Sequence, residues 1–385
     1  MDFSFDETQQ AVSESAAAVF GGLVSDERVA EVEKTADRFD ERLWGELAKA
    51  NLLGIPIPEE NGGAGLDLIS TCLVLEQQGK TVAPIPLWPT LVLGAMPIAK
   101  WGTDAQRSEL LPGVASGDIK LSAALNEVGA FRTAVPSILA IQDGDSYVLS
   151  GTSYGVPQGH LAARIIVPAR LNGGLVVAIV DPSGERARLE RAETTYRQIH
   201  PHLHLDGLRV GPDQILGSAE SATDVVSSML DLARTGLAAL ALGVSEEAIR
   251  RAAAYMNERN QFGHPLATFQ GAKMRAADAW IDTEAMRVTL WEAAWRIDTG
   301  RPAADAVAVA KWWASEAGQR VVHATQHLHG GVGADISYPI HRFFLWGKQI
   351  ELMLGTPPAE LDELGSILAR VLTPAATSGS GGARK

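Results

Sequence analysis

The residues of this sequence best suited to hold a ligand lie in two short stretches. The first, residues 258–270, reads E-R-N-Q-F-G-H-P-L-A-T-F-Q. Arg259 lies in the last turn of a long predicted helix and faces Phe262 across one turn. Gly263 and Pro265 end that helix. A cation and an aromatic ring beside a helix end indicate a site for a flat, polar and anionic ligand.

The second stretch, residues 326–333, reads Q-H-L-H-G-G-V-G. Gln326 ends another long predicted helix, and Gly330 and Gly331 allow a large ligand to approach the backbone closely. The alternative interpretation is two helix caps beside an ordinary surface arginine. Caps explain the glycines and the proline, but they do not explain the full spacing of the two stretches.

Three histidines provide the only pattern that suggests a metal. His200, His202 and His204 alternate along a predicted strand and therefore project from one face. A structural zinc site needs four ligands, and the sequence shows no fourth. Histidines at an exposed sheet edge are the preferred interpretation, so no metal is predicted.

The elements that must position these residues follow from the spacing of apolar residues. Three-to-four spacing predicts helices in the first part of the chain, with Asp40 and Asp67 as starting residues and Thr103 with Gln106 as a capping box. These helices cover residues 9–23, 39–50, 66–80, 87–101 and 103–114. Short β-favouring runs then occupy residues 121–125, 138–142, 146–150, 164–169, 174–180 and 202–210.

The last part of the chain is rich in alanine and leucine and is predicted to form a four-helix bundle. Its long helices cover residues 222–258, 269–299, 303–327 and 339–353. The predicted organisation is an α+β fold with an N-terminal helical domain, an antiparallel β domain, the bundle and a flexible Ser/Gly/Ala-rich tail. The corresponding ranges are 1–117, 118–218, 219–372 and 373–385.

Composition limits the classes of function. The chain has 385 residues and a net charge of −13, which argues against a broad nucleic-acid surface. Its one cysteine, Cys72, excludes an internal disulfide and is consistent with a reducing cytoplasm. The N-terminus lacks a signal-peptide core, and no uninterrupted apolar run reaches the roughly 18 residues of a membrane helix. A cytoplasmic protein without nucleic-acid or membrane partners is expected.

The two stretches resemble a known pattern, R-x-x-F-G-x-P-L-x-x-F-Q followed by Q-x-x-x-G-G-x-G, of the acyl-CoA dehydrogenase family of flavoproteins. Residues 52–66, L-L-G-I-P-I-P-E-E-N-G-G-A-G-L, are similar to another motif of that family. The resemblance spans nearly the whole chain and implies FAD as cofactor. It also implies FAD-binding roles across a dimer interface for six residues, Arg259, Phe262, Gln270, Gln326, Gly330 and Gly331.

The resemblance implies a reaction in which a carboxylate removes the α-proton of an acyl-CoA thioester while the β-hydrogen leaves as hydride to the flavin. The family places this base as the glutamate of Y-E-G-T, where this sequence has Leu354. Some relatives place it beside the arginine that opens the first bundle helix, where this sequence has Ala233 and Arg234. No catalytic residue is therefore assigned. Glu351, three residues before Leu354, is a weak candidate for a displaced base.

The β region departs from the family as well. The segment T-E-x-x-A-G-S-D, which touches the flavin ring in the family, corresponds to residues 126–132, N-E-V-G-A-F-R. The segment W-I-T-N corresponds to residues 155–158, G-V-P-Q. Gly155 has no ring to lay on a flavin, and Pro157 has neither a hydroxyl group nor an amide N–H. Three parts of one active site are altered together, whereas the nucleotide-binding stretches are retained.

This asymmetry leads to the hypothesis of a non-catalytic subunit in a heterotetrameric acyl-CoA dehydrogenase, which completes the FAD site of a related catalytic subunit. Such α2β2 members of the family act in lipid metabolism on CoA thioesters from actinobacterial steroid catabolism, with electron-transfer flavoprotein or a similar acceptor. One alternative is a homomeric dehydrogenase with an unusual base. Others are an inactive acyl-CoA-binding scaffold or regulator and, least favoured, a DNA-associated member of the family.

Overall fold

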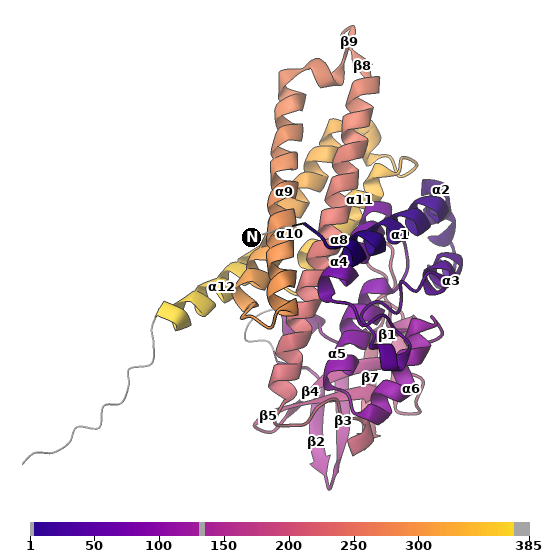
Figure 1. The fold of residues 1–385 in the computed structure, drawn as a ribbon, viewed down its shortest axis with the longest axis vertical. Helices are drawn as coiled ribbons and strands as arrows, with labels where there is room; N and C mark the ends of the chain where they lie inside the picture. Colours follow the sequence, from indigo (N-terminus) through magenta and orange to yellow (C-terminus); the bar gives the residue numbers. More distant parts are fainter. Residues whose placement is uncertain (1–3, 131–134, 373–385) are drawn as a thin grey trace, which may run out of the picture.

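The computed structural model describes residues 4–130 and 135–372 and shows helices, a sheet and a long helical bundle in chain order (Figure 1). The predicted helices of the first part are confirmed, as are the caps at Asp40, Asp67 and Thr103. One helix, α2, was not predicted, and the predicted segment 87–101 divides into a π-helical turn and α5. The helices are α1 (Glu7–Leu23), α2 (Asp26–Val32), α3 (Glu41–Lys49), α4 (Leu68–Thr81), α5 (Met96–Trp101) and α6 (Asp104–Ala115).

A seven-stranded sheet follows, in the order β1-β4-β2-β3-β7-β6, with β5 paired to β4. The strands are β1 (Leu121–Ala123), β2 (Leu139–Asp143), β3 (Ser146–Ser153), β4 (Arg164–Leu171), β5 (Gly174–Val180), β6 (Ala187–Glu190) and β7 (His202–Val210). The sheet is mostly antiparallel, as predicted, and differs from that prediction in two places, where β1 and β2 pair in parallel with β4. The hairpin inserted between β1 and β4 makes the connection long enough for parallel pairing. Strand β6 was not predicted.

The bundle contains the four predicted helices and a fifth, α12, that was not predicted. These are α8 (Ala222–Glu258), α9 (Gln270–Asp298), α10 (Ala304–Leu328), α11 (Ile340–Leu352) and α12 (Pro357–Leu372). A two-stranded hairpin of β8 (Asn260–Gln261) and β9 (His264–Pro265) joins α8 to α9 at one end of the molecule, opposite the sheet (Figure 1). The bundle and the N-terminal helices share one hydrophobic core, and the sheet has its own.

Within the described residues, α8 is the one helix whose length and apolar composition would suffice to cross a membrane. Its most apolar 18-residue window is 78% buried inside the protein. The expectation drawn from the sequence overlooked this helix, because a few polar residues interrupt its apolar run. The core that covers it accounts for its apolar character.

Helices α4 and α8 approach each other so closely that their backbones touch. A Cβ at Gly79 would lie 2.3 Å from the Leu240 carbonyl oxygen, and one at Gly243 would lie 2.0 Å from that of Glu76. Both distances are far shorter than real Cβ contacts, so both positions require glycine. This crossing fixes the N-terminal helices against the bundle.

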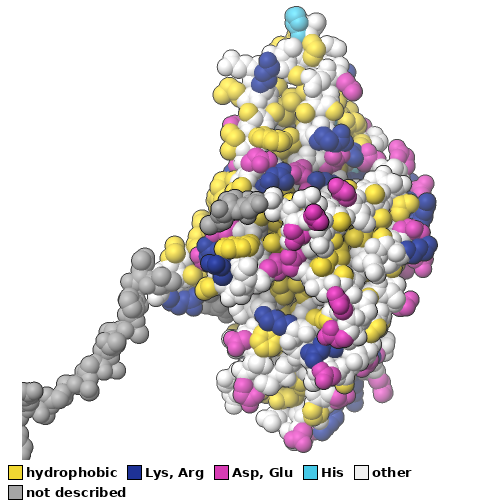
Figure 2. All heavy atoms as spheres, viewed as in Figure 1, with side chains coloured by type: hydrophobic (Ala, Val, Ile, Leu, Met, Phe, Trp, Pro, Cys, Tyr) yellow, Lys and Arg dark blue, Asp and Glu magenta, His cyan; other side chains and the backbone are white. Residues whose placement is uncertain are grey.

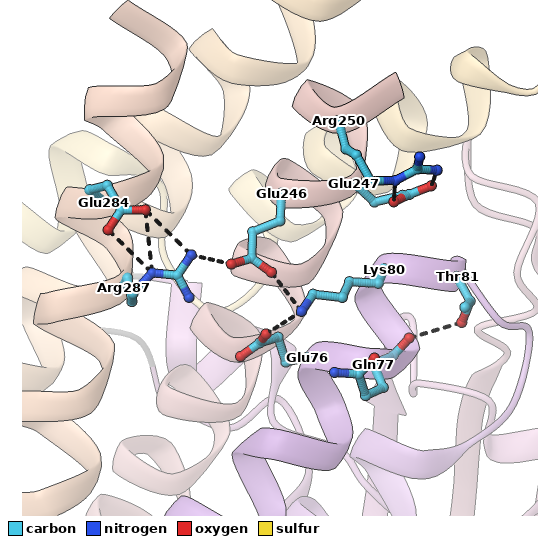
Figure 3. Close-up of polar contacts among 9 residues, drawn as sticks. All are labelled: Glu76, Gln77, Lys80, Thr81, Glu246, Glu247, Arg250, Glu284 and Arg287. Atoms are coloured by element: carbon cyan, nitrogen blue, oxygen red, sulfur yellow. Dashed lines mark hydrogen bonds and ion pairs between the residues drawn. The ribbon is translucent and has the colours of Figure 1, made fainter. Parts of the chain in front are cut away.

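An ion-pair network lies beside this crossing (Figure 3). The Lys80 Nζ lies 2.6 Å from Glu76 Oε1 and 2.8 Å from Glu246 Oε2, and Arg287 of α9 pairs with the other oxygen of Glu246. Glu284 lies on the far side of Arg287. The network joins α4, α8 and α9, so it stabilises the same junction as the two glycines.

Replacing Lys80 with methionine is expected to destabilise the protein by about 3 kcal/mol, because two largely buried carboxylates would lose their shared cation. Urea denaturation measures this difference. The matched control is Lys49→Met, which removes a lysine that pairs with Glu46 on the exposed surface of α3. The control should change the free energy of unfolding by less than about 1 kcal/mol. Equal effects of the two substitutions would show that the network does not stabilise the junction.

Candidate functional site

The first predicted stretch forms the tip of the long helical end. Arg259 ends α8 in extended backbone geometry, and the hairpin turns at Phe262 and Gly263, whose φ angles are 52° and 81°. A phenylalanine with a positive φ is uncommon and costs about 1–2 kcal/mol. The ring of Phe262 is 91% exposed and meets Phe269 edge to face at 6.3 Å. The hairpin therefore presents an aromatic side chain to the outside.

The second stretch lies next to this tip, and the two enclose a groove of about 810 Å³. Its walls come from the end of α8, the hairpin, the start of α9 and the turn after α10. Four of the six predicted FAD-binding residues line it together, namely Arg259, Phe262, Gly330 and Gly331. The predicted grouping of these two distant stretches is therefore seen in the structure.

The other two predicted residues lie outside the lining of this groove. Gln270 is the first residue of α9 and is exposed. Gln326 is partly buried beneath the turn, where a Cβ at Gly333 would lie 2.4 Å from the Gln326 carbonyl oxygen. The Gln326 Oε1 atom is buried without a hydrogen-bond partner among the residues the structure describes. The predicted roles of Gln270 and Gln326 in binding FAD stay predictions.

Two arginines give the groove its positive charge. Arg259 and Arg275 both line it, and neither guanidinium forms an ion pair with another residue in the described ranges 4–130 and 135–372. Guanidinium groups bind phosphates through paired hydrogen bonds. Arg275 was not predicted from the sequence. Its position about one and a half turns after Gln270 on α9 could have indicated it.

The region around Leu354 is packed with apolar side chains. Leu354 is 2% exposed and has a φ angle of 53°, and it lies beyond the end of α11. The short helix α7 (Asn126–Ala130) covers it. A Cβ at Gly129 would lie 2.7 Å from Leu354 Cδ2 and 3.2 Å from Leu230 Cδ2. Leu354, which takes the position of the family's base, thus packs against α7. The segment at α7 is the one that touches the flavin in the family.

The other altered positions form hydrogen bonds with each other or with their neighbours. The Asn126 side-chain amide donates to the Gly155 carbonyl, and the Ser122 hydroxyl donates to the Pro157 carbonyl at 2.6 Å. The Gly155 N–H donates to His202 Nδ1 at 3.1 Å. These donors find acceptors within the protein, but Asn126 Oδ1 is buried without a hydrogen-bond partner among the described residues. Residues 131–132 of the corresponding motif lie outside the described residues.

The structure argues against Glu351 as a base that shares a helix face with Leu354. Helix α11 ends at Leu352, so the assumed helical relation between the two residues is wrong. The Glu351 carboxylate instead pairs with Lys348 on the same helix. Met353 and Gly355, with the positive φ of Leu354, turn the chain away toward α12.

Two buried cations hold the backbone at Leu354. The Arg234 Nε donates to the Leu354 carbonyl at 3.0 Å, and its Nη2 approaches the Gly129 carbonyl at 3.4 Å. The Lys311 ammonium donates to the Gly355 carbonyl at 2.7 Å. Arg234 and Lys311 therefore position the loop through its carbonyl oxygens, and no carboxylate of that loop is involved.

A buried carboxylate lies beside these cations. Glu360 of α12 has a fully buried side chain, with Oε1 3.4 Å from Arg234 Nε, and Glu363 pairs with Arg234 at 2.8 Å. Neither Glu360 oxygen accepts a hydrogen bond of good geometry within the described part of the chain. Burial raises the pKa of Glu360 to about 7, and burial likewise lowers the pKa of Lys311 to about 7. The sequence analysis missed Glu360 because α12 was not predicted, and Lys311 because no motif marks it within α10.

The three histidines do not form a metal site. Burial lowers the pKa of His200 to about 3, and its ring bonds to the Tyr196 hydroxyl at 2.8 Å. His202 accepts from Gly155, and His204 lies between Thr152 and Glu190. No group of three potential metal ligands occurs among the residues described. The interpretation as histidines at an exposed sheet edge is wrong, because β7 lies between β3 and β6 and His200 is buried.

Comparison with known proteins identifies the family. Family models for the acyl-CoA dehydrogenase N-terminal and C-terminal domains match residues 6–118 and 223–365. The chain belongs to the acyl-CoA dehydrogenase family. It is 33% identical to acyl-CoA dehydrogenase FadE27 of Mycobacterium tuberculosis over 384 residues, which cover 97% of this chain and 100% of FadE27.

Two solved structures extend this similarity. A variant of the Tcur3481-Tcur3483 steroid ACAD is 45% identical, with a TM-score of 0.89 and coverage of 95% of this chain and 99% of its own. The ChsE4-ChsE5 complex from Mycobacterium tuberculosis is 34% identical, with a TM-score of 0.91 and coverage of 97% and 100%. The predicted acyl-CoA dehydrogenase fold is confirmed.

The family is one of flavin-dependent oxidoreductases, and its cofactor is FAD, as predicted. This chain offers different surroundings to the nucleotide end and to the ring end of an FAD molecule. The groove offers two unpaired arginines and close backbone approach, which suit the adenosine diphosphate half. The positions that correspond to the ring end are packed and hydrogen-bonded to one another. The residues of this chain therefore fit the nucleotide end of FAD and do not fit its ring.

The pKa of Glu360 leads to a prediction about stability and pH. Because folding raises this pKa from 4.5 to about 7, the folded protein keeps a proton that the unfolded chain releases. The contribution of Glu360 to stability is therefore present below about pH 4.5 and is lost as the pH rises through about 7. Glu360→Gln, which does not titrate, should gain stability relative to the unsubstituted protein as the pH rises from 5 to 8.

Urea denaturation at several pH values measures this difference. The exposed residue Glu14 provides the control, since Glu14→Gln should shift the free energy of unfolding by less than about 0.5 kcal/mol at every pH. A difference between Glu360→Gln and the unsubstituted protein that stays constant between pH 5 and 8 would exclude titration of Glu360 in this range.

Proposed function

We propose that this chain is the non-catalytic subunit of a heteromeric, FAD-dependent acyl-CoA dehydrogenase and that it completes the FAD site of a related catalytic subunit. One observation carries the proposal. The same chain combines a groove with two unpaired arginines at one end of α8 and a Leu354 loop that carries no carboxylate, beside a Glu360 whose buried side chain lies 3.4 Å from Arg234, at the other. A self-sufficient member of the family would need both ends to be functional.

The surface of the helical end supports a partner chain. Besides Phe262, four residues at intervals of seven along α9 are exposed, Met274, Ile281, Val288 and Trp295. An apolar repeat of seven residues is the pattern by which helices pair side by side. Hydrophobic side chains are visible along this part of the molecule in Figure 2. The repeat begins next to the groove, which is where a shared FAD site would require the partner.

Similar proteins support the same proposal. One is a steroid ACAD with two named components, and another is a complex of ChsE4 and ChsE5. By this similarity we infer a heterotetramer in steroid catabolism, with the CoA thioester of a bulky steroid-derived acid as substrate and electron-transfer flavoprotein or a similar carrier as acceptor. The chain alone is then inactive.

The role of this chain in the reaction follows from its own residues. When bound, FAD would supply the acceptor for the β-hydrogen of the thioester as hydride, and the partner would supply the base. Arg259 and Arg275 neutralise the pyrophosphate, and Phe262 covers the ligand and excludes water. Arg234 and Lys311 keep the Leu354 loop closed, so no substrate proton is removed on this chain.

The two other functions considered from the sequence are less well supported. A homomeric enzyme would need a base, and the Glu351 carboxylate is paired with Lys348 on a helix that ends before Leu354. An inactive acyl-CoA-binding scaffold would not need the retained groove at the hairpin. A DNA-associated role is disfavoured by the net charge of −13.

The test is the flavin content of the purified chain, alone and co-expressed with a related chain that has the family's glutamate. We expect little FAD on the chain alone and saturation in the complex, measured by visible absorbance against protein concentration. Arg259→Ala should weaken FAD retention in the complex by about 10- to 100-fold, because a charged hydrogen-bonded contact of about 1.5–3 kcal/mol is lost. The surface variant Arg186→Ala should retain FAD.

An active, flavin-saturated assembly made from this chain alone would contradict the proposal. Full FAD occupancy of the complex with Arg259→Ala would separately remove Arg259 from the site. Size measurement by light scattering accompanies both experiments, so that loss of flavin is not confused with loss of assembly.

A further inference from the structure

One side chain in the groove has an unsatisfied hydrogen-bonding atom. His329 is 2% exposed and precedes the two glycines of the second stretch. Its Nδ1 lies 2.7 Å from the Thr325 carbonyl oxygen. A carbonyl oxygen can only accept, so Nδ1 carries the hydrogen. In the neutral ring, Nε2 is therefore an acceptor.

The Nε2 atom is buried and has no hydrogen-bond partner in the described ranges 4–130 and 135–372. Buried polar atoms of this kind are rare in folded proteins, and each calls for an explanation. The ring stacks on Tyr255 at 4.6 Å, and Tyr338 lies 5.4 Å away on another side. All three side chains line the groove. The ring is thus held in one orientation at the wall of a ligand-sized space.

The surroundings keep this ring neutral. Burial lowers the pKa of His329, and the charge of Arg251 lowers it further. The groups that face it are Arg251 and Tyr255 from α8 and Tyr338 from the segment before α11. None of these is a carboxylate, and the one group that raises the pKa of His329, the Thr325 carbonyl, is outweighed by burial.

We propose that His329 Nε2 accepts a hydrogen bond from the adenosine half of the nucleotide in this groove. The inference rests on the function proposed above and adds a residue that determines specificity at the same site. Phosphate oxygens are acceptors and cannot satisfy Nε2, so the arginines and His329 must bind different parts of the ligand. Adenosine carries two kinds of donor, the exocyclic amine of adenine and the ribose hydroxyls.

The experiment measures binding of ADP to the full chain by titration calorimetry at pH 8. His329→Phe keeps an aromatic ring against Tyr255 but removes Nε2, and it should weaken ADP binding by about 3- to 10-fold. His329→Gln places an amide oxygen near the position of Nε2 and should restore most of the affinity. The control is His323→Phe, an exposed histidine of α10 outside the groove lining, which should bind ADP normally.

Analogues of ADP identify the donor. If the exocyclic amine is bound, IDP should bind the unsubstituted chain about 3- to 10-fold more weakly than ADP, and the difference should vanish in His329→Phe. If a ribose hydroxyl is bound, 2′-deoxy-ADP or 3′-deoxy-ADP should show this behaviour instead. Equal affinity for ADP and all three analogues overturns the proposal.

A pH series tests the acceptor role. Protonation turns Nε2 into a donor, so acid should weaken ADP binding to the unsubstituted chain more than to His329→Phe. Stronger binding in acid would indicate an imidazolium–phosphate contact and would overturn the proposal.

The remaining outcomes separate this inference from the function on which it rests. Unchanged ADP binding by His329→Phe, together with weaker binding by Arg259→Ala, overturns only the role of His329. Absence of ADP binding to the unsubstituted chain at millimolar concentration overturns this inference, whereas the proposed function is tested separately by the flavin content of the co-expressed complex.

Discussion

The close crossing of α4 and α8 is the constraint on which the rest of this structure depends. Gly79 and Gly243 let the two backbones touch, and the ion pairs of Lys80 hold the junction. Helix α8 has 37 residues, so it is about 55 Å long and extends in both directions from this fixed point. Its first half carries Arg234 to the Leu354 loop, and its end carries Arg259 to the groove. One rigid helix therefore sets the distance between the two ends of the site.

The two ends of the site, the Leu354 loop and the groove, differ from the family's pattern in different ways. At the Leu354 loop, buried cations bind backbone carbonyls, and α7 fills the space above the leucine. This is a stable arrangement, because the cations have partners and the apolar side chains are packed. At the groove, in contrast, arginines and a histidine nitrogen have no partner within the described residues. The oxygens of Glu360 and Asn126 Oδ1 are also unsatisfied in the described part of the chain, but they are buried, whereas the polar groups of the groove line a ligand-sized space. In the proposed function, the ligand contacts of this chain are therefore at the nucleotide end.

Much of the fold and of the groove could be predicted from the sequence. Strong periodicity located α8, and the β-favouring runs located all six predicted strands to within about three residues at each end. The two motifs located four of the residues that line the groove. The sequence could not predict α12, because a proline-rich start hides it, and so the buried Glu360 was missed. The relation of Glu351 to Leu354 was misjudged because Met353 is extended and ends α11 at Leu352 before the chain reaches Leu354. His329 lies within a recognised motif, but only its hydrogen bond to Thr325 reveals which nitrogen is available.

The exposed hairpin has a consequence for the life of the protein in a cell. Phe262 and the apolar repeat of α9 are the kind of surface that chaperones and proteases bind when it is left uncovered. If the proposed heteromer forms, a copy made in excess of its partner would keep this surface open and be removed first. Matched amounts of the two chains could then arise by selective degradation, without any need for equal rates of synthesis.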